Sequence, residues 1–142
     1  MHLQVEFREL LLSNLINFAL HFFGALVSLV IFKFVYTWVT PQDEWKLIKE
    51  DKNTAAAIGF GGSVLGFAVA LGGVISHSVS LLDFAIWAVV ALIAQPSAFA
   101  VLRFVFMPAI AKRIDDGEVS AGIILGAFSI AVGILNAACM TY

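Results

Sequence analysis

Polar side chains recur at helical spacing in the otherwise apolar stretch near the N-terminus. Steps of three, four, three and four residues separate Asn14, Asn17, His21, Gly24 and Ser28. This spacing places them on one face of a helix. In lipid such a face turns toward protein or water, so its polar groups predict either a hydrated path with His21 near mid-membrane or hydrogen bonds between helices.

A second polar feature is Gln95, which stands directly before Pro96 in an apolar run. Proline removes a backbone donor and clashes with the preceding turn, so a kink is expected there. The Gln95 amide then either bonds the freed carbonyls or joins a polar lining, because broken helices at mid-depth often hold transport sites. The candidate path residues are Asn14, Asn17, His21, Ser28, Gln95 and Asn136.

The short connection after residue 75 carries Ser76, His77, Ser78, Ser80 and Asp83. A Ser-His-Asp hydrolase needs such groups to converge in a pocket with an oxyanion hole, and no Gly-x-Ser-x-Gly elbow is present. We expect Asp83 to be the N-cap of the following helix, with Ser and His as polar turn residues. Alternatively, His77 and Asp83 form an outer mouth that binds a proton or a cation.

Two cations, Lys33 and Arg103, occupy corresponding places near the ends of apolar runs. Long cationic side chains at such places usually extend to the lipid headgroups. A ring that binds anionic lipid is the alternative role, since basic pockets between helices hold such headgroups.

Small residues form smooth faces in two of the apolar runs. Gly62-x-x-x-Gly66 and Gly122-x-x-x-Gly126 are motifs that let helix backbones approach closely. The two faces predict helix packing, either inside one chain or between the chains of a dimer, with an open wall beside a pore as the alternative. The glycines assigned to packing are Gly59, Gly62, Gly66, Gly73, Gly122, Gly126 and Gly133.

Composition places much of the chain in lipid. Of the 142 residues, 61% are hydrophobic and 13% are charged, whereas a soluble domain is about half apolar and about a quarter charged. The mean hydropathy is +0.99, and a net charge of −2 offers no basic surface to nucleic acid. Cys139 stands alone, and nucleotide loops and metal motifs are missing, so we expect no enzyme activity, no cofactor and no metal site.

Four apolar runs are long enough to span a bilayer, which takes about 20 helical residues. They lie near residues 15–38, 55–75, 84–106 and 120–140. Their continuous apolarity argues against a spanning sheet, so the predicted fold is an all-α membrane protein with four transmembrane helices. Because seven of the eight Lys and Arg residues fall in or beside the connections 41–53 and 108–119, we expect these in the cytoplasm and both termini outside.

The two halves of the chain follow one pattern. Residues 1–80 form the first predicted helical hairpin and residues 81–142 the second. Pro41 matches Pro108 and a charged run follows each proline, at an offset of 65 to 67 residues. Each half holds an even number of spans, so the repeats are parallel, about an axis along the membrane normal.

Four segments resemble a known family: TPQDEW from Thr40, NTAAA from Asn53, HSVSLLDFAIW from His77 and GILNAACM from Gly133. They are similar to the YjfL-like family of small bacterial inner-membrane proteins, across essentially the whole chain. The resemblance implies a bacterial inner membrane and two copies of a two-helix domain, and it implies no established reaction, substrate or cofactor. Glu118 stands where the first copy has Asn53, so the halves need not be equivalent in function.

Two function hypotheses remain open. In both we expect a homo-oligomer, with a dimer favoured, because the small-residue faces and the near absence of extramembrane mass favour self-association. One hypothesis is a small channel or transporter subunit for an ion or a small cationic solute. The other is a membrane scaffold or envelope-stress component whose charged connections recruit a cytoplasmic protein partner or organise the anionic lipid of the bilayer.

Overall fold

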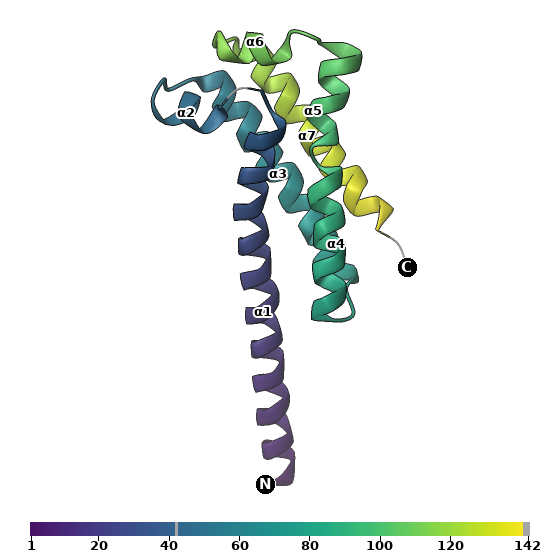
Figure 1. Ribbon diagram of the computed structural model, residues 1–142. Coiled ribbons are helices and arrows are strands. Elements are labelled where there is room, and N and C mark those ends of the chain that lie inside the picture. The colour runs from purple at the N-terminus through teal and green to yellow at the C-terminus, as the bar shows by residue number, and fades with distance from the viewer. Residues whose placement is uncertain (42, 141–142) are drawn as a thin grey trace.

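A computed structural model describes residues 1–41 and 43–140, and in this part of the chain every regular element is a helix (Figure 1). The elements are α1 (His2–Val39), α2 (Glu44–Lys49), α3 (Thr54–His77), α4 (Leu81–Ala94), α5 (Ser97–Val101), the π-helical η1 (Leu102–Phe106), α6 (Ile110–Asp115) and α7 (Val119–Cys139). Four segments are long and apolar enough to cross a membrane: α1, α3, α4 continued through η1, and α7. The predicted all-α class with four spanning helices is confirmed, whereas the arrangement as two repeated hairpins stays a prediction.

The short helices and the tight turn mark opposite ends of the bundle. Helices α2 and α6 lie together at one end, and the turn between α3 and α4 lies at the other (Figure 1). Helix α1 runs on well past this turn, so its N-terminal half stands apart from the other helices (Figure 1). It begins at His2, although the span was expected from about residue 15, because neither Pro nor Gly interrupts residues 2–23.

The packing centre is the contact between α3 and α7, which is the most extensive contact between helices. A Cβ atom at Gly66 would overlap the carbonyl oxygen of Ser129, and one at Gly133 would overlap the carbonyl oxygen of Gly66. Backbones therefore touch here, as small-x-x-x-small motifs allow. The glycines that face the other helix of this pair are Gly59, Gly62, Gly66, Gly73, Gly122, Gly126 and Gly133. The two smooth faces thus meet inside one chain.

Helix α1 joins the bundle through its C-terminal half. Its buried residues are Ser28, Phe32 and Tyr36. The Phe32 ring stacks on Phe67 of α3 with a centroid separation of 4.6 Å. Closer to the other end of the bundle, a Cβ at Gly24 would lie 3.0 Å from the ring of Phe84 in α4. Aromatic contacts therefore attach α1 to both α3 and α4.

The third span breaks where Pro96 predicts. Helix α4 ends at Ala94 and α5 begins at Ser97. At the start of α4 the expected cap is wrong: the N-cap is Ser80, whose hydroxyl accepts the backbone N–H of Asp83 at 3.1 Å. The Asp83 carboxylate accepts the N–H of Val79 at 3.0 Å. Asp83 therefore lies in the first turn as the second half of a reciprocal cap.

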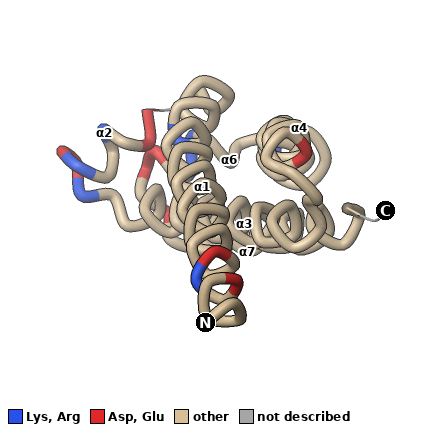
Figure 2. The backbone as a smooth tube through the Cα atoms, turned by 90° about the horizontal axis from the view of Figure 1, so that it is seen from below, with Lys and Arg blue, Asp and Glu red and all other residues tan. Residues whose placement is uncertain are grey.

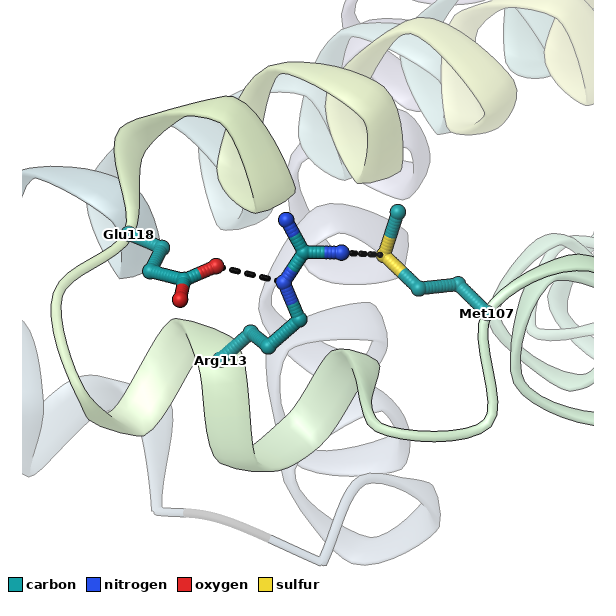
Figure 3. A network of polar contacts seen from close by, with 3 residues as sticks. All are labelled: Met107, Arg113 and Glu118. Carbon is teal, nitrogen blue, oxygen red and sulfur yellow. Dashed lines mark hydrogen bonds and ion pairs between the residues drawn. The ribbon is translucent and has the colours of Figure 1, made fainter.

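The connections at the α2/α6 end are held by side chains. Asn53 caps α3, because its Oδ1 accepts the N–H of Ala56 at 3.0 Å, and its Nδ2 donates to the carbonyl of Ile114 in α6 at 2.7 Å. In the other half, Arg113 bridges the Glu118 carboxylate and the sulfur of Met107 (Figure 3). Asn53 therefore caps α3 with its side chain, whereas Glu118, the N-cap residue of α7, makes no such cap and pairs with Arg113.

A substitution at Gly66 tests the α3–α7 contact. We expect Gly66→Ala to destabilise the bundle by about 1–3 kcal/mol, because the added methyl group forces two touching backbones apart. Gly72→Ala is the matched control on the same helix, since no atom of another described helix lies within 4 Å of its Cβ position. It should leave stability unchanged or raise it by about 0.5–1 kcal/mol through helix propensity. The measurement is unfolding in detergent with increasing SDS; equal effects of the two variants would contradict the contact.

Candidate functional site

The polar face of α1 opens into a groove at the turn between α3 and α4. The groove has a volume of about 460 Å³, and Asn14, Asn17 and His21 line it together with Ser78 and Ser80 of the turn. All three α1 residues come from the predicted stripe. His21 therefore lies level with the ends of α3 and α4. The expected position near mid-membrane would instead place it midway along these two spans.

Local contacts orient His21. Its Nδ1 donates a hydrogen bond to the carbonyl of Asn17 at 2.8 Å. The ring stands edge-on to Phe84 with a centroid separation of 5.4 Å. The Nδ1 proton is thereby committed to the backbone of α1, and Phe84 covers one side of the ring. The groove can thus offer amides, hydroxyls and an imidazole to a polar solute.

The stripe does not continue as an open path toward the α2/α6 end. Ser28 is buried, and its hydroxyl donates to the carbonyl of Gly24 at 2.8 Å. Gly24 itself packs against Phe84. This part of the stripe serves helix packing, but the Ser28 hydrogen bond stays within α1 and does not join two helices.

Gln95 belongs to the contact between α3 and α7. It is only 2% exposed, and its Nε2 donates to the carbonyl of Ser129 at 2.8 Å. The hydroxyls of Ser63 and Ser129 lie 3.0 Å apart beside it. Gly66 leaves the space for the amide, since a Cβ there would come within 2.6 Å of the Gln95 Nε2 atom. The break at Pro96 therefore turns the Gln95 side chain toward α7. Its amide links this fourth span to the third span, which contains Gln95.

The remaining path candidate is Asn136, on α7. Its side chain is partly buried. Within the described residues the Asn136 Nδ2 and the Gln95 Oε1 atoms are buried without a hydrogen-bond partner. Neither Gln95 nor Asn136 lines the groove beside α1. The structure thus gathers Asn14, Asn17 and His21 and places the other three path candidates elsewhere.

The two residues proposed for an outer mouth lie at the α3–α4 turn. His77 Nδ1 donates to the carbonyl of Gly73 at 2.9 Å, and Asp83 supports the start of α4. The described part of the groove wall includes Ser78, Val79 and Ser80 of this turn, but neither His77 nor Asp83. The His77 ring is thus bonded to its own helix and Asp83 supports the turn, and an outer mouth formed by the two stays a prediction.

Lys33 and Arg103 lie in different surroundings. The Lys33 ammonium stands 4.5 Å from the centre of the Phe34 ring and 5.2 Å from that of Trp45 in α2. The Arg103 guanidinium lies 5.4 Å from the ring of Phe104, its neighbour in the chain. A pocket at the α2/α6 end includes Lys33 in its lining and does not include Arg103.

Sequence reasoning missed the buried carboxylate of Glu44. Its side chain is fully buried, and it accepts a hydrogen bond from the Tyr36 hydroxyl at 3.1 Å. In the sequence Glu44 is one of several acids in the charged connection 41–53. The available signal was its spacing from Leu47, because residues three apart share one face of a helix and Leu47 is buried as well.

Within residues 1–41 and 43–140, no three His, Cys, Asp or Glu side chains are grouped as metal ligands. Cys139 is exposed near the end of α7. The site geometry therefore consists of a polar groove beside α1, a buried amide at the helix-packing centre, and a pocket with lysines beside α2.

Comparison with known proteins identifies the family. Residues 10–140 match the family described as Domain of Unknown Function (DUF350). The UPF0719 inner membrane protein YjfL of Escherichia coli K12 is 39% identical over 132 residues, which are 93% of this chain and 98% of that protein. The protein of the same name from E. coli O157:H7 matches equally, and no solved structure matches. Because both matches run nearly from end to end, this chain belongs to the YjfL-like (DUF350) family of membrane proteins.

Proposed function

We propose that this protein resides in the bacterial inner membrane and that its copies assemble around α1, whose polar face lines a path for an ion or a small cationic solute. The observation that carries the proposal is the exposure of α1: every residue from 1 to 20 is exposed, including Asn14 and Asn17 of the polar stripe. The name of the E. coli relative, an inner membrane protein, supports the location.

The charges support one orientation. Lys46, Lys49, Lys52, Lys112 and Arg113 all belong to the connections at the α2/α6 end. Since positively charged connections stay in the cytoplasm, the α2/α6 end is inside and the α3–α4 turn is outside. The groove beside α1 then opens toward the outer side.

The length of α1 requires a partner. At about 1.5 Å per residue, its 38 residues extend about 57 Å, whereas the 24 residues of α3 extend about 36 Å. The hydrocarbon core is about 30 Å thick. The exposed half of α1 carries large apolar side chains such as Phe7, Leu11 and Ile16, which a water-facing helix does not tolerate. The same half of α1 in further copies of this chain can cover them.

The small-residue faces no longer argue for a dimer, because α3 and α7 use them within one chain. Their touching backbones also exclude a path between these two helices. A polar path between copies needs a polar face on an exposed helix, and Glu6, Glu9, Ser13, Asn17 and His21 provide one along α1. Acids at the entrance favour cations over anions.

Cross-linking tests the assembly. In a Cys139→Ala background, we expect Asn17→Cys to form disulfide-linked dimers in membranes, because the polar faces of neighbouring α1 helices turn toward each other. Ala19→Cys is the control, since residue 19 lies on the opposite face of the helix at the same depth. Equal cross-linking of both variants, or none of Asn17→Cys, would contradict the arrangement.

Flux tests the transport role. Proteoliposomes with the unmodified chain should release K⁺ or a diamine, and Asn17→Leu/His21→Leu should lower the release to that of empty vesicles by removing the polar groups. Ala19→Leu, at the same depth, should leave the release unchanged. The proposed path is wrong if the unmodified protein assembles and releases neither solute, or if both variants behave alike.

A second candidate role is a scaffold that recruits a cytoplasmic protein or organises anionic lipid at the α2/α6 end. It is supported by Lys46, Lys49 and Glu50, which are exposed on or beside α2, whereas Glu44 is turned inward. Lys46→Glu/Lys49→Glu should then abolish capture of the partner with no change in the unfolding midpoint. Capture that survives the charge reversal would count against recruitment through α2.

A further inference from the structure

A pocket of about 390 Å³ lies between the C-terminal part of α1 and helix α2. Three lysines enter its lining, Lys33 from α1 and both Lys46 and Lys49 from α2. Figure 2 shows the blue cationic segments of α2 at the side of the molecule away from α4. The pocket shares no lining residue with the groove at the other end of the bundle.

Two of the three lysines lie near one indole. The Lys33 ammonium lies 5.2 Å and the Lys49 ammonium 6.0 Å from the centre of the Trp45 ring. Among the described residues, no ion pair joins Lys33, Lys46 or Lys49 to an acid. Three ammonium groups, brought together and not neutralised by contact with a carboxylate, can therefore bind an external anion.

Two acids in the lining set the charge of the pocket. Asp43 is engaged at the start of α2, where its Oδ1 accepts the backbone N–H of Lys46 at 3.2 Å. Glu50 lies at the other end of the same helix. Three lysines against two acids leave a net charge of +1 in the pocket lining. This charge matches a singly charged phosphodiester better than a multiply charged free phosphate.

The surroundings favour a lipid as the source of the phosphate. Phe34, which also lines the pocket, is 61% exposed, and Trp38 one turn further is 87% exposed. Exposed aromatic rings at the end of a span are typical of the membrane interface. Val30 and Ile31, next along α1, are exposed as well and offer an apolar surface to an acyl chain.

We propose that Lys33, Lys46 and Lys49 bind the phosphodiester of an anionic phospholipid in this pocket, with Trp45 beside the Lys33 and Lys49 ammonium groups and an acyl chain along α1. The site rests on the second candidate role, in which the protein organises anionic lipid. It does not depend on a path along α1. Arg103 is not part of the site, although its position in the sequence matches that of Lys33.

The test is native mass spectrometry of the full-length protein in detergent, titrated with phosphatidylglycerol or with phosphatidylcholine. The unmodified chain should bind phosphatidylglycerol in preference to phosphatidylcholine. Lys33→Gln/Lys49→Gln should weaken phosphatidylglycerol binding about thirtyfold, or about fivefold per lysine, as expected for cations near an anionic lipid surface. Lys52→Gln/Lys112→Gln, which removes the same charge from the same end outside the pocket, should change binding less than about twofold.

Competition distinguishes the sources of phosphate. Glycerol phosphate, which has no acyl chains, should displace the lipid only weakly. The site would be overturned if the two double variants weakened lipid binding equally, or if the protein did not prefer the anionic lipid. If glycerol phosphate bound as strongly as phosphatidylglycerol, the assignment of the site to a lipid would be overturned. Each variant is checked by its unfolding midpoint in SDS. Lipid binding that persists without capture of any protein partner would support the site and contradict only the recruiting role.

Discussion

The touching backbones of α3 and α7 are the contact on which the rest of the structure depends. In lipid, apolar side chains gain little by leaving acyl chains for one another, so helices associate through close packing and hydrogen bonds. Gly62, Gly66 and Gly133 remove the side chains that would keep the two backbones apart. Because α3 and α7 come from different halves of the chain, this contact joins the halves, and the Gln95 amide then fastens the broken third span to the pair through Ser129.

The spacing of small residues was sufficient to predict which faces of the second and fourth spans pack. It could not show whether the partner face belongs to the same chain, because a glycine face is compatible with any close backbone. The same limit applies to Gln95. Its place before Pro96 predicts a broken helix, whereas the direction of its amide depends on the room left by Gly66 on another span. Local patterns define an element, and the contacts of its side chains depend on the assembled bundle.

The ends of α1 show two further limits of prediction from sequence. Hydropathy identified the apolar span, but the helix continues to His2 through Glu6 and Glu9, since a charged sequence without Pro or Gly remains helical. At the other end, Glu44 counts as one acid in a polar connection. Its spacing from Leu47 indicates the buried face of α2, but its hydrogen bond to Tyr36 depends on how α2 folds back onto α1.

The two halves of α1 differ in what they contribute to the buried core. Its C-terminal half is held by Phe32 and Tyr36 against α3, close to the pocket of lysines, so changes there affect both packing and the surface beside α2. Its N-terminal half contributes nothing to the buried core, since every residue up to position 20 is exposed. A long apolar helix outside its own bundle is compatible with lipid or with another protein surface around it. The proposed assembly and path therefore depend on the polar stripe of that half, whereas the packing centre of the bundle lies between α3 and α7.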